Sequence, residues 1–257
     1  MDRTTRTPED VLRLLDGLFT ADTDKWQGFY DDRSRPVPFF VGKPDENLAE
    51  LLDRGLIPTG DRAGRALDLG CGPGRNALHL AAHGYEVDAV DLSGAALDWA
   101  RERADEARLD VRFLHGDAFA LDAIGDRGPY DLIYDSGCFH HLPPHRRPTY
   151  LAFLARHLAP GAHFALTCFA AGEGGMGSEL PDPAFYRDRS LHGGLAYTAE
   201  ALRALFADTA GLEELALRRM RDEPADSPHF GESFLWAGLF VTPPAAGTDR
   251  TDVPPGR

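Results

Sequence analysis

The sequence predicts an α/β domain whose central β-sheet is mostly parallel and is covered by helices on both faces. The first observation is a regular alternation from Arg65 onward, where apolar runs typical of strands alternate with helical segments of about 10–15 residues. The second is the segment ALDLGCGPG, in which a buried strand runs into closely spaced glycines and then into a helix. The third is the length of 257 residues, which is sufficient for one such domain with an additional segment.

The part of the chain before this alternation is predicted to form two helices separated by an irregular segment. Residues 8–19 place apolar side chains on one helical face, which is expected to pack against the rest of the domain. Residues 25–44 are rich in aromatic residues and proline without a clear period, so we expect an ordered loop there. A second amphipathic helix is expected within residues 45–56.

The alternating part of the chain predicts seven strands, four intervening helices and one long loop. The predicted strands cover residues 66–70, 86–91, 111–115, 130–135, 162–168, 212–218 and 233–241. The predicted helices cover residues 75–84, 94–108, 145–158 and 199–208. Residues 170–197 are expected to form a loop with glycines near both ends, and a loop of this length in a compact domain is usually functional or disordered.

Composition and charge exclude several classes of partner. The chain carries 27 basic and 41 acidic residues, and the resulting net charge of −14 repels phosphate backbones and anionic lipids. We therefore expect neither a nucleic-acid nor a membrane partner. The three cysteines have no paired spacing, and the first residues lack the apolar core of a secretion signal. These features predict a cytoplasmic protein. We expect either a monomer or a homodimer.

The glycine turn and two later carboxylates predict a binding site for an adenosyl ligand. Gly70, Gly72 and Gly74 allow the backbone to approach a ligand closely, and the helix that follows offers free N–H groups. Asp91 ends the second strand, where its carboxylate can accept both hydroxyls of a ribose. Asp117 follows the third strand and can accept from an adenine amino group. The alternative for each carboxylate is an ordinary strand-end or helix-capping role.

The motifs LDLGCGPG, VDLS and HGDAF, in this order, resemble those of class I methyltransferases that use S-adenosylmethionine (SAM). The resemblance covers residues 65–241 and implies a Rossmann-like sheet in the strand order 3-2-1-4-5-7-6 with an antiparallel last strand. It also implies SAM as cofactor and S-adenosylhomocysteine (SAH) as its product. The residues predicted to bind the cofactor are Asp68, Gly70, Cys71, Gly72, Gly74, Asn76, Asp91, Leu92, Asp117, Ala118, Phe119 and Asp135.

The segment after the fourth strand, DSGCFHHLPPHRR, is predicted to face the methyl acceptor, because ligands bind at the carboxyl ends of such strands. It resembles bacterial small-molecule methyltransferases of the thiopurine and tellurite-resistance type. His140 is the first candidate for a general base, with Asp135 and His141 as further catalytic candidates. Alternatively, both histidines only hydrogen-bond the loop or contact SAM. No metal is expected, because the adjacent histidines with two prolines give poor ligand geometry.

Two segments outside the sheet are predicted to close the site. Trp26, Tyr30, Phe39 and Phe40 are too many aromatic residues for a solvated loop, and aromatic faces suit both a sulfonium and an apolar acceptor. In the second segment, residues 170–197, Tyr186 and Arg189 are expected to contact the acceptor. The alternative for the first segment is plain packing of an N-terminal helix pair against the sheet.

The predicted organisation is therefore an N-terminal helical and aromatic lid at residues 1–60, a SAM-binding methyltransferase domain at 61–242 and a disordered tail at 243–257. The predicted activity is transfer of a methyl group to an O, N or S nucleophile of a small molecule. The alternative is a SAM-binding enzyme of the same fold that performs cyclisation, decarboxylation or hydrolysis.

Overall fold

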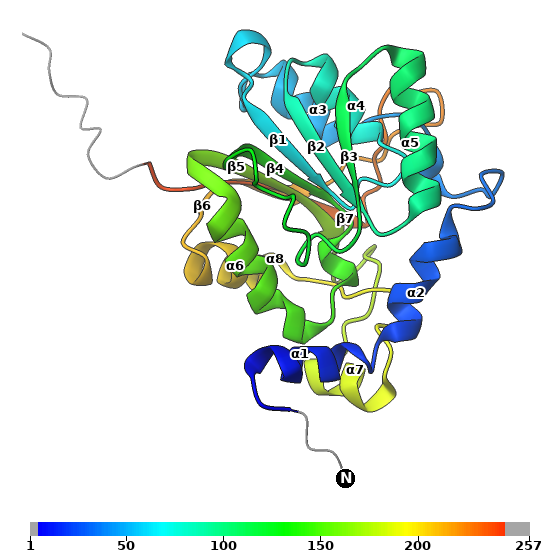
Figure 1. The fold of residues 1–257 in the computed structure, drawn as a ribbon, viewed down its shortest axis with the longest axis vertical. Coiled ribbons are helices and arrows are strands. Elements are labelled where there is room, and N and C mark those ends of the chain that lie inside the picture. The colour runs from blue at the N-terminus through cyan, green and yellow to red at the C-terminus, as the bar shows by residue number, and fades with distance from the viewer. Residues whose placement is uncertain (1–4, 245–257) are drawn as a thin grey trace, which may run out of the picture.

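A computed structural model describes residues 5–244 and contains a seven-stranded sheet in the order β3-β2-β1-β4-β5-β7-β6 (Figure 1). The strands are β1 (Arg65–Leu69), β2 (Glu86–Asp91), β3 (Val111–His115), β4 (Tyr130–Ser136), β5 (Leu158–Phe169), β6 (Glu213–Arg219) and β7 (Leu235–Val241). Strands β1 to β5 are parallel, whereas β7 pairs antiparallel with both β5 and β6. The predicted fold class, strand order and antiparallel last strand are confirmed.

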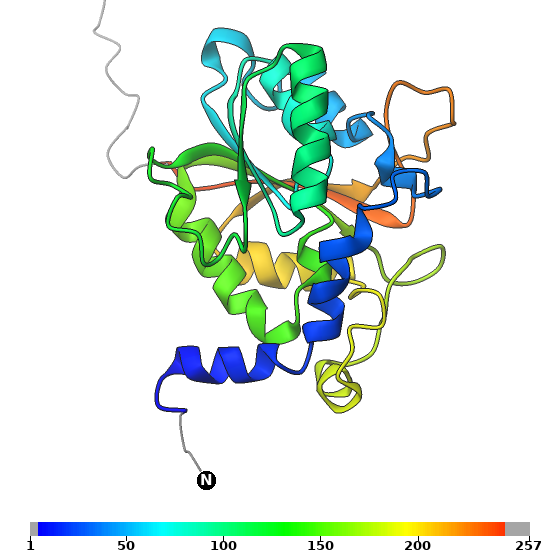
Figure 2. The same ribbon diagram turned by 45° about the vertical axis from the view of Figure 1, so that its right-hand side comes forward.

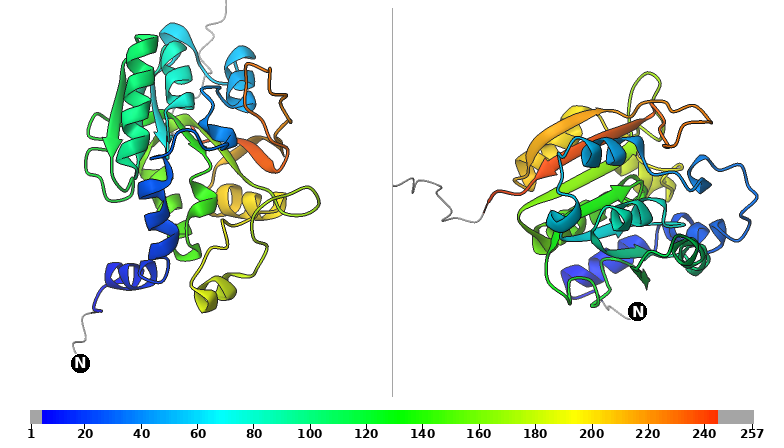
Figure 3. Two further views of the ribbon diagram at one scale, coloured as in Figure 1. Left: turned by 90° about the vertical axis from the view of Figure 1, so that its right-hand side faces the viewer. Right: turned by 90° about the horizontal axis from the view of Figure 1, so that it is seen from above.

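Helices cover both faces of this sheet because side chains alternate between the faces along each strand. On one face lie α3 (Glu46–Asp53), α4 (Arg75–Ala82) and α5 (Gly94–Ala107), and on the other α6 (Arg147–His157) and α8 (Ala199–Arg203) (Figures 1 and 3). Along β1, Ala66 belongs to one buried apolar cluster and Leu67 to the other, so each face of the sheet has its own core.

The N-terminal region differs from its prediction in two respects. A helix α1 (Pro8–Asp16) is followed by a second helix, α2 (Thr20–Phe29). The prediction of an irregular segment at 25–44 is therefore wrong for residues 25–29, which belong to α2. The apolar residues of α2 do not recur with a helical period, and aromatic contacts such as that of Trp26 with His141 stabilise the helix instead. The apolar face predicted at 8–19 is also not buried along α1, where Val11 and Leu14 remain 43% and 64% exposed.

The segment at 170–197 is more ordered than the predicted loop. A short helix, α7 (Asp182–Asp188), lies in its middle and begins at prolines. Isolated bridges pair Ala170 with Tyr197 and Ser178 with Leu195, so the two arms of the segment are hydrogen-bonded to each other. Figure 2 shows these arms leaving the sheet beside α2 and returning through α7.

The helices α1 and α2 are attached to the sheet domain by polar contacts near α6 and α7. The Asp16 carboxylate pairs with Arg146, and it also accepts from His145 Nε2 at 2.9 Å. The Asp22 carboxylate accepts a hydrogen bond from the Leu191 N–H at 3.0 Å. The two helices therefore lie across the edge at which the parallel strands end (Figures 1 and 2).

Within the described part of the chain, no helix is long and apolar enough to cross a membrane. The predicted disordered tail falls almost entirely at 245–257, outside the described residues.

Candidate active site

A cavity of about 550 Å³ lies at the carboxyl ends of β1, β2, β4 and β5, and its volume is in the range typical of small-molecule sites. Its walls come from the glycine turn after β1, the end of β2, the segments after β3 and β4, and the N-terminal helices. This is the edge at which open α/β sheets bind ligands. The cavity therefore lies where the sequence predicts the site.

The glycine turn lies directly under the N-terminal helices. Gly72 has a φ of +51°, and a Cβ at this position would lie 3.1 Å from the Tyr30 hydroxyl oxygen. Gly74 has a φ of +79°, and a Cβ there would lie 3.0 Å from that of Ala100 on α5. Both positions therefore require glycine for conformation and for space. Gly74 supports the turn from behind, whereas Gly70, Cys71 and Gly72 line the cavity.

Asp91 joins the end of β2 to the glycine turn. One carboxylate oxygen accepts from the Gly72 N–H and the other from the Ser93 N–H, each at 2.8 Å. Burial raises the pKa of this carboxyl, although the backbone hydrogen bonds oppose the shift. Each oxygen keeps a free lone pair beside the cavity, so Asp91 can still accept two ribose hydroxyls.

Asp68 lies at the end of β1 with an unsatisfied oxygen. The residue is 1% exposed, and its Oδ2 has no hydrogen-bond partner among the described residues. Burial raises the pKa of Asp68 to about 8. The positive charge of Arg75 opposes this shift, and the negative charges of Asp45 and Asp135 reinforce it. A cationic amino group would satisfy this oxygen and restore its negative charge. The methionine end of SAM carries such a group, so the residues present fit this cofactor.

A buried polar network fixes the first turn of α4, and sequence reasoning missed most of it. The Arg75 guanidinium pairs with Asp45 and donates to Ser136 Oγ at 3.1 Å. Asn76 accepts from the Asp45 N–H at 2.9 Å through its Oδ1. Tyr134 on β4 donates its hydroxyl to the same Asp45 carboxylate at 2.7 Å. Both Arg75 and Asn76 line the cavity.

Asp135 lies beneath the cavity and does not line it. One carboxylate oxygen accepts from the Cys138 N–H at 2.8 Å, and the other accepts from the Tyr150 hydroxyl at 2.7 Å. Burial raises its pKa to about 6, against the effect of these hydrogen bonds. The side chain thus holds the segment after β4 in position, and its contacts are with protein groups.

The predicted adenine side of the site lies after β3. Asp117 is exposed, and its carboxylate accepts from the Phe119 N–H at 2.9 Å. Leu92, Asp117, Ala118 and Phe119 all line the cavity, so the predicted neighbours of the adenine lie together.

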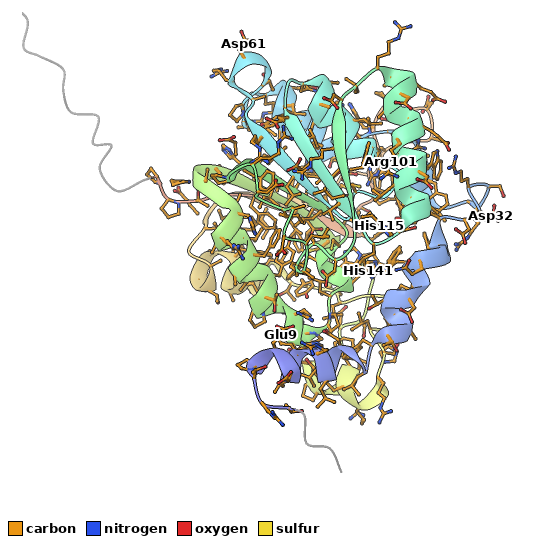
Figure 4. All side chains as sticks on the ribbon, viewed as in Figure 1. Glu9, Asp32, Asp61, Arg101, His115 and His141 are labelled. Atoms are coloured by element: carbon orange, nitrogen blue, oxygen red, sulfur yellow. The ribbon has the colours of Figure 1, made fainter. Side chains whose placement is uncertain are left out.

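The two histidines lie on a short 3₁₀ turn after β4, and both line the cavity. The His140 ring stacks on Phe169, with ring centroids 3.7 Å apart and planes 19° apart. His141 contacts the Trp26 indole of α2 with a centroid distance of 4.9 Å. Figure 4 shows His141 beside the strand ends, facing α2. The turn therefore connects the sheet edge to the predicted lid.

The structure divides the predicted lid residues into two groups. Trp26, Tyr30 and Phe39 line the cavity. Phe40 lies behind them and packs against Tyr30 and Trp99, with centroid distances of 5.4 Å for both pairs. The other two predicted lid residues, Tyr186 and Arg189, are not part of the lining: the Tyr186 hydroxyl contacts His145, and Arg189 caps α7.

Sequence reasoning also missed an aromatic wall of the cavity. Phe169 ends β5, and Phe230 and Phe234 precede β7. All three line the cavity, and Phe169 lies 6.3 Å from Phe234 between ring centroids. Their spacing in the sequence carries no periodic signal, so nothing in the sequence alone identifies them as one wall. No group of three residues able to hold a metal ion occurs in residues 5–244.

A Rossmann-like sheet whose glycine turn is joined to an acid on β2 defines a site for an adenosyl cofactor, and comparison with known proteins specifies it further. Residues 66–161 match a family model described as a methyltransferase domain. An uncharacterized methyltransferase of Schizosaccharomyces pombe is 33% identical over 100 residues, which cover 39% of this chain and 68% of that protein. The chain belongs to the class I SAM-dependent methyltransferases, and SAM is its cofactor.

This chain spans little more than half of another curated relative and most of two solved structures. The 2-heptyl-1-hydroxyquinolin-4(1H)-one methyltransferase of Mycobacteroides abscessus is 31% identical over 137 residues, which cover 53% of this chain and only 57% of that protein. A structure from work on conversion of a disulfide bond into a thioacetal group during echinomycin biosynthesis is 28% identical, with a TM-score of 0.63 and coverage of 86% of this chain and 93% of that chain. The 1,6-didemethyltoxoflavin-N1-methyltransferase of Burkholderia thailandensis, solved with SAH, is 20% identical, with a TM-score of 0.56 and coverage of 95% and 93%. This last likeness shows the fold alone.

Proposed function

We propose that the protein transfers the methyl group of SAM to an O, N or S nucleophile of a small molecule with an aromatic, largely apolar body. The observation that carries this proposal is the composition of the cavity. Its cofactor half, at the glycine turn and Asp91, is continuous with a half lined by Trp26, Phe39 and Phe169. Aromatic walls of this kind bind flat apolar ligands through stacking and edge contacts.

Within this proposal, the protein binds and orients the two reactants. SAM supplies an electrophilic methyl group on a sulfonium, which is a good leaving group. Asp91 holds the ribose, Asp68 the amino group, and the segment after β3 the adenine. The aromatic wall holds the acceptor on the other side and excludes water, so that catalysis depends mainly on in-line positioning. Asp68 and Asp91 are buried at the edge of the sheet, which favours a fixed geometry for the cofactor.

The names of the relatives support a small-molecule acceptor. One is a methyltransferase of 2-heptyl-1-hydroxyquinolin-4(1H)-one, and another, from Amycolatopsis mediterranei, is a 27-O-demethylrifamycin SV methyltransferase. Both names state methyl transfer to a small organic molecule. They do not favour the alternative of cyclisation, decarboxylation or hydrolysis on the same fold.

The experiment that tests the proposal is label transfer. The protein is incubated with methyl-labelled SAM and fractions of small-molecule extracts, and the labelled product is identified by mass spectrometry. The expected result is one labelled small molecule formed together with SAH, and less labelled product with the Asp91→Ala variant at a SAM concentration that does not saturate it. Consumption of SAM without transfer of the label would instead support the alternative chemistry.

A further inference from the structure

The hydrogen bonds of His140 determine where its proton lies. The backbone N–H of Phe169 donates to His140 Nδ1 at 3.2 Å. A backbone N–H can only donate, so Nδ1 carries no proton. A neutral imidazole with an unprotonated Nδ1 carries its proton on Nε2. His140 is therefore a donor through Nε2.

This assignment propagates to His141. The two Nε2 atoms lie 3.1 Å apart, and because His140 donates, His141 Nε2 is the acceptor. Neutral His141 must then carry its proton on Nδ1. This nitrogen is buried and has no hydrogen-bond partner among residues 5–244. A buried N–H donor without a partner is unfavourable, and a ligand atom that accepts a hydrogen bond would satisfy it.

The pair has no position at which an additional proton can be held. If His140 were protonated at Nδ1, this N–H and the backbone N–H of Phe169 would point at each other, with no acceptor between them. Protonation of His141 at Nε2 would do the same at the contact between the rings. Burial and the positive charge of Lys25 on α2 lower the pKa of His141 to about 3, and burial and the neighbouring His141 lower that of His140 well below its usual range. Two other charged groups of the cavity lining, Asp16 and Arg146, are paired with each other. The remaining charged groups of the lining are Asp22, Asp68, Arg75, Asp91 and Asp117.

We propose that His141 donates a hydrogen bond from Nδ1 to the nucleophilic atom of the acceptor, and that His140 is a positioning residue that fixes this tautomer. The acceptor then enters as an anion, such as a phenolate, a thiolate or the anion of an acidic heteroaromatic ring. This inference rests on the proposed function and replaces the general-base role predicted for His140. The charge of Lys25 and the sulfonium both favour an anionic nucleophile at this place.

The reaction balances without a protein base. The acceptor loses its proton to solvent before it binds. Its lone pair then forms the bond to the methyl carbon while the carbon–sulfur bond breaks, and that electron pair remains on sulfur, which becomes a neutral thioether. His141 lines the cavity, and its ring packs against the Trp26 indole. Because Nδ1 is buried, side chains around the His141 ring must shift before an acceptor atom reaches this N–H.

Nitrogen NMR tests the proposal without knowledge of the acceptor. The protein is labelled with ¹⁵N-histidine, saturated with SAH, and its ring nitrogens are assigned through bonds and followed from about pH 5 to about pH 8. We expect two neutral rings throughout, with the proton on Nε2 of His140 and on Nδ1 of His141. A proton on Nε2 of His141, or a cationic ring in this range, would overturn the proposal. Since the spectra are independent of label transfer, failure of the proposed function and failure of this inference are distinguishable.

Discussion

The two halves of the cavity are built in different ways. In the cofactor half, the main contacts join residues close in sequence: Asp91 accepts from Gly72, which is 19 positions away. In the acceptor half, the wall combines Trp26, His141, Phe169 and Phe234, which come from four distant parts of the chain. The unit of β1, α4 and β2 can therefore keep the Asp91–Gly72 contact while substitutions in separate segments change the acceptor.

The largest effect is expected from Asp91→Ala. Loss of the charged acceptor for the ribose hydroxyls, worth roughly 1.5–3 kcal/mol, should weaken SAH binding about 10-fold to 150-fold. Isothermal titration calorimetry with SAH measures the change. Asp117→Ala is the matched control, because this exposed carboxylate also lines the cavity and is expected to lose less. Unchanged affinity in Asp91→Ala would exclude Asp91 from the ribose site.

The second prediction concerns the charge of Asp68, whose pKa is raised to about 8 in the unliganded protein. If the amino group of SAH pairs with it, binding stabilises the ionised carboxylate and lowers this pKa. Binding at pH 7 should then release a proton, and affinity should rise up to about tenfold per pH unit until about pH 8, where the free carboxyl is already ionised. Calorimetry in two buffers of different ionisation enthalpy detects the proton. Asp68→Asn should abolish its release, and a wild-type protein that releases none would contradict the assignment.

The same division explains what could be predicted from the sequence. The strand order follows from the family motifs, and most of the predicted cofactor residues lie at or directly after the ends of β1, β2 and β3, where short motifs contain the glycines and acids. By contrast, Asp45 and Arg75 are 30 positions apart, and neither stands out in a pattern of apolar residues. Their ion pair depends on how α3 packs against α4, which local sequence does not determine.

The acceptor side was less predictable for a related reason. The helix α2 has no side-chain hydrogen bond at its N-terminus and no buried residue. The apolar residues at 20–29 also do not recur with a helical period, so the sequence does not predict this helix. Tertiary contacts such as that of Trp26 with His141 stabilise it instead. The tautomer of His140 depends in turn on the N–H of Phe169, a residue 29 positions away. Residue type alone could nominate the histidines but could not assign their protons.

The third prediction is a moderate loss in His141→Phe, measured with the acceptor that label transfer identifies. Removal of one charge-assisted hydrogen bond should lower kcat/KM about tenfold, while SAH affinity is unchanged. The shape of the pH profile should survive, because the acceptor ionises in solution. Disappearance of the acid limb in the variant would instead assign the titrating base to His141. His157→Phe, on α6 and outside the cavity lining, is the control for loss of a buried imidazole.

The smallest effect is expected at the lid, where two tryptophans of one aromatic cluster differ in position. Trp26 lines the cavity and contacts His141, whereas Trp99 on α5 packs behind the lid against Phe40. Trp26→Ala should raise the KM for the acceptor about threefold, the order expected for loss of one aromatic contact, with little change in the Kd for SAH. Trp99→Ala removes a side chain of the same size and should lower thermal stability without a selective effect on the acceptor. Equal increases in KM in the two variants would mean that the cluster acts only as packing, whereas a selective increase in Trp26→Ala would place the acceptor against the lid.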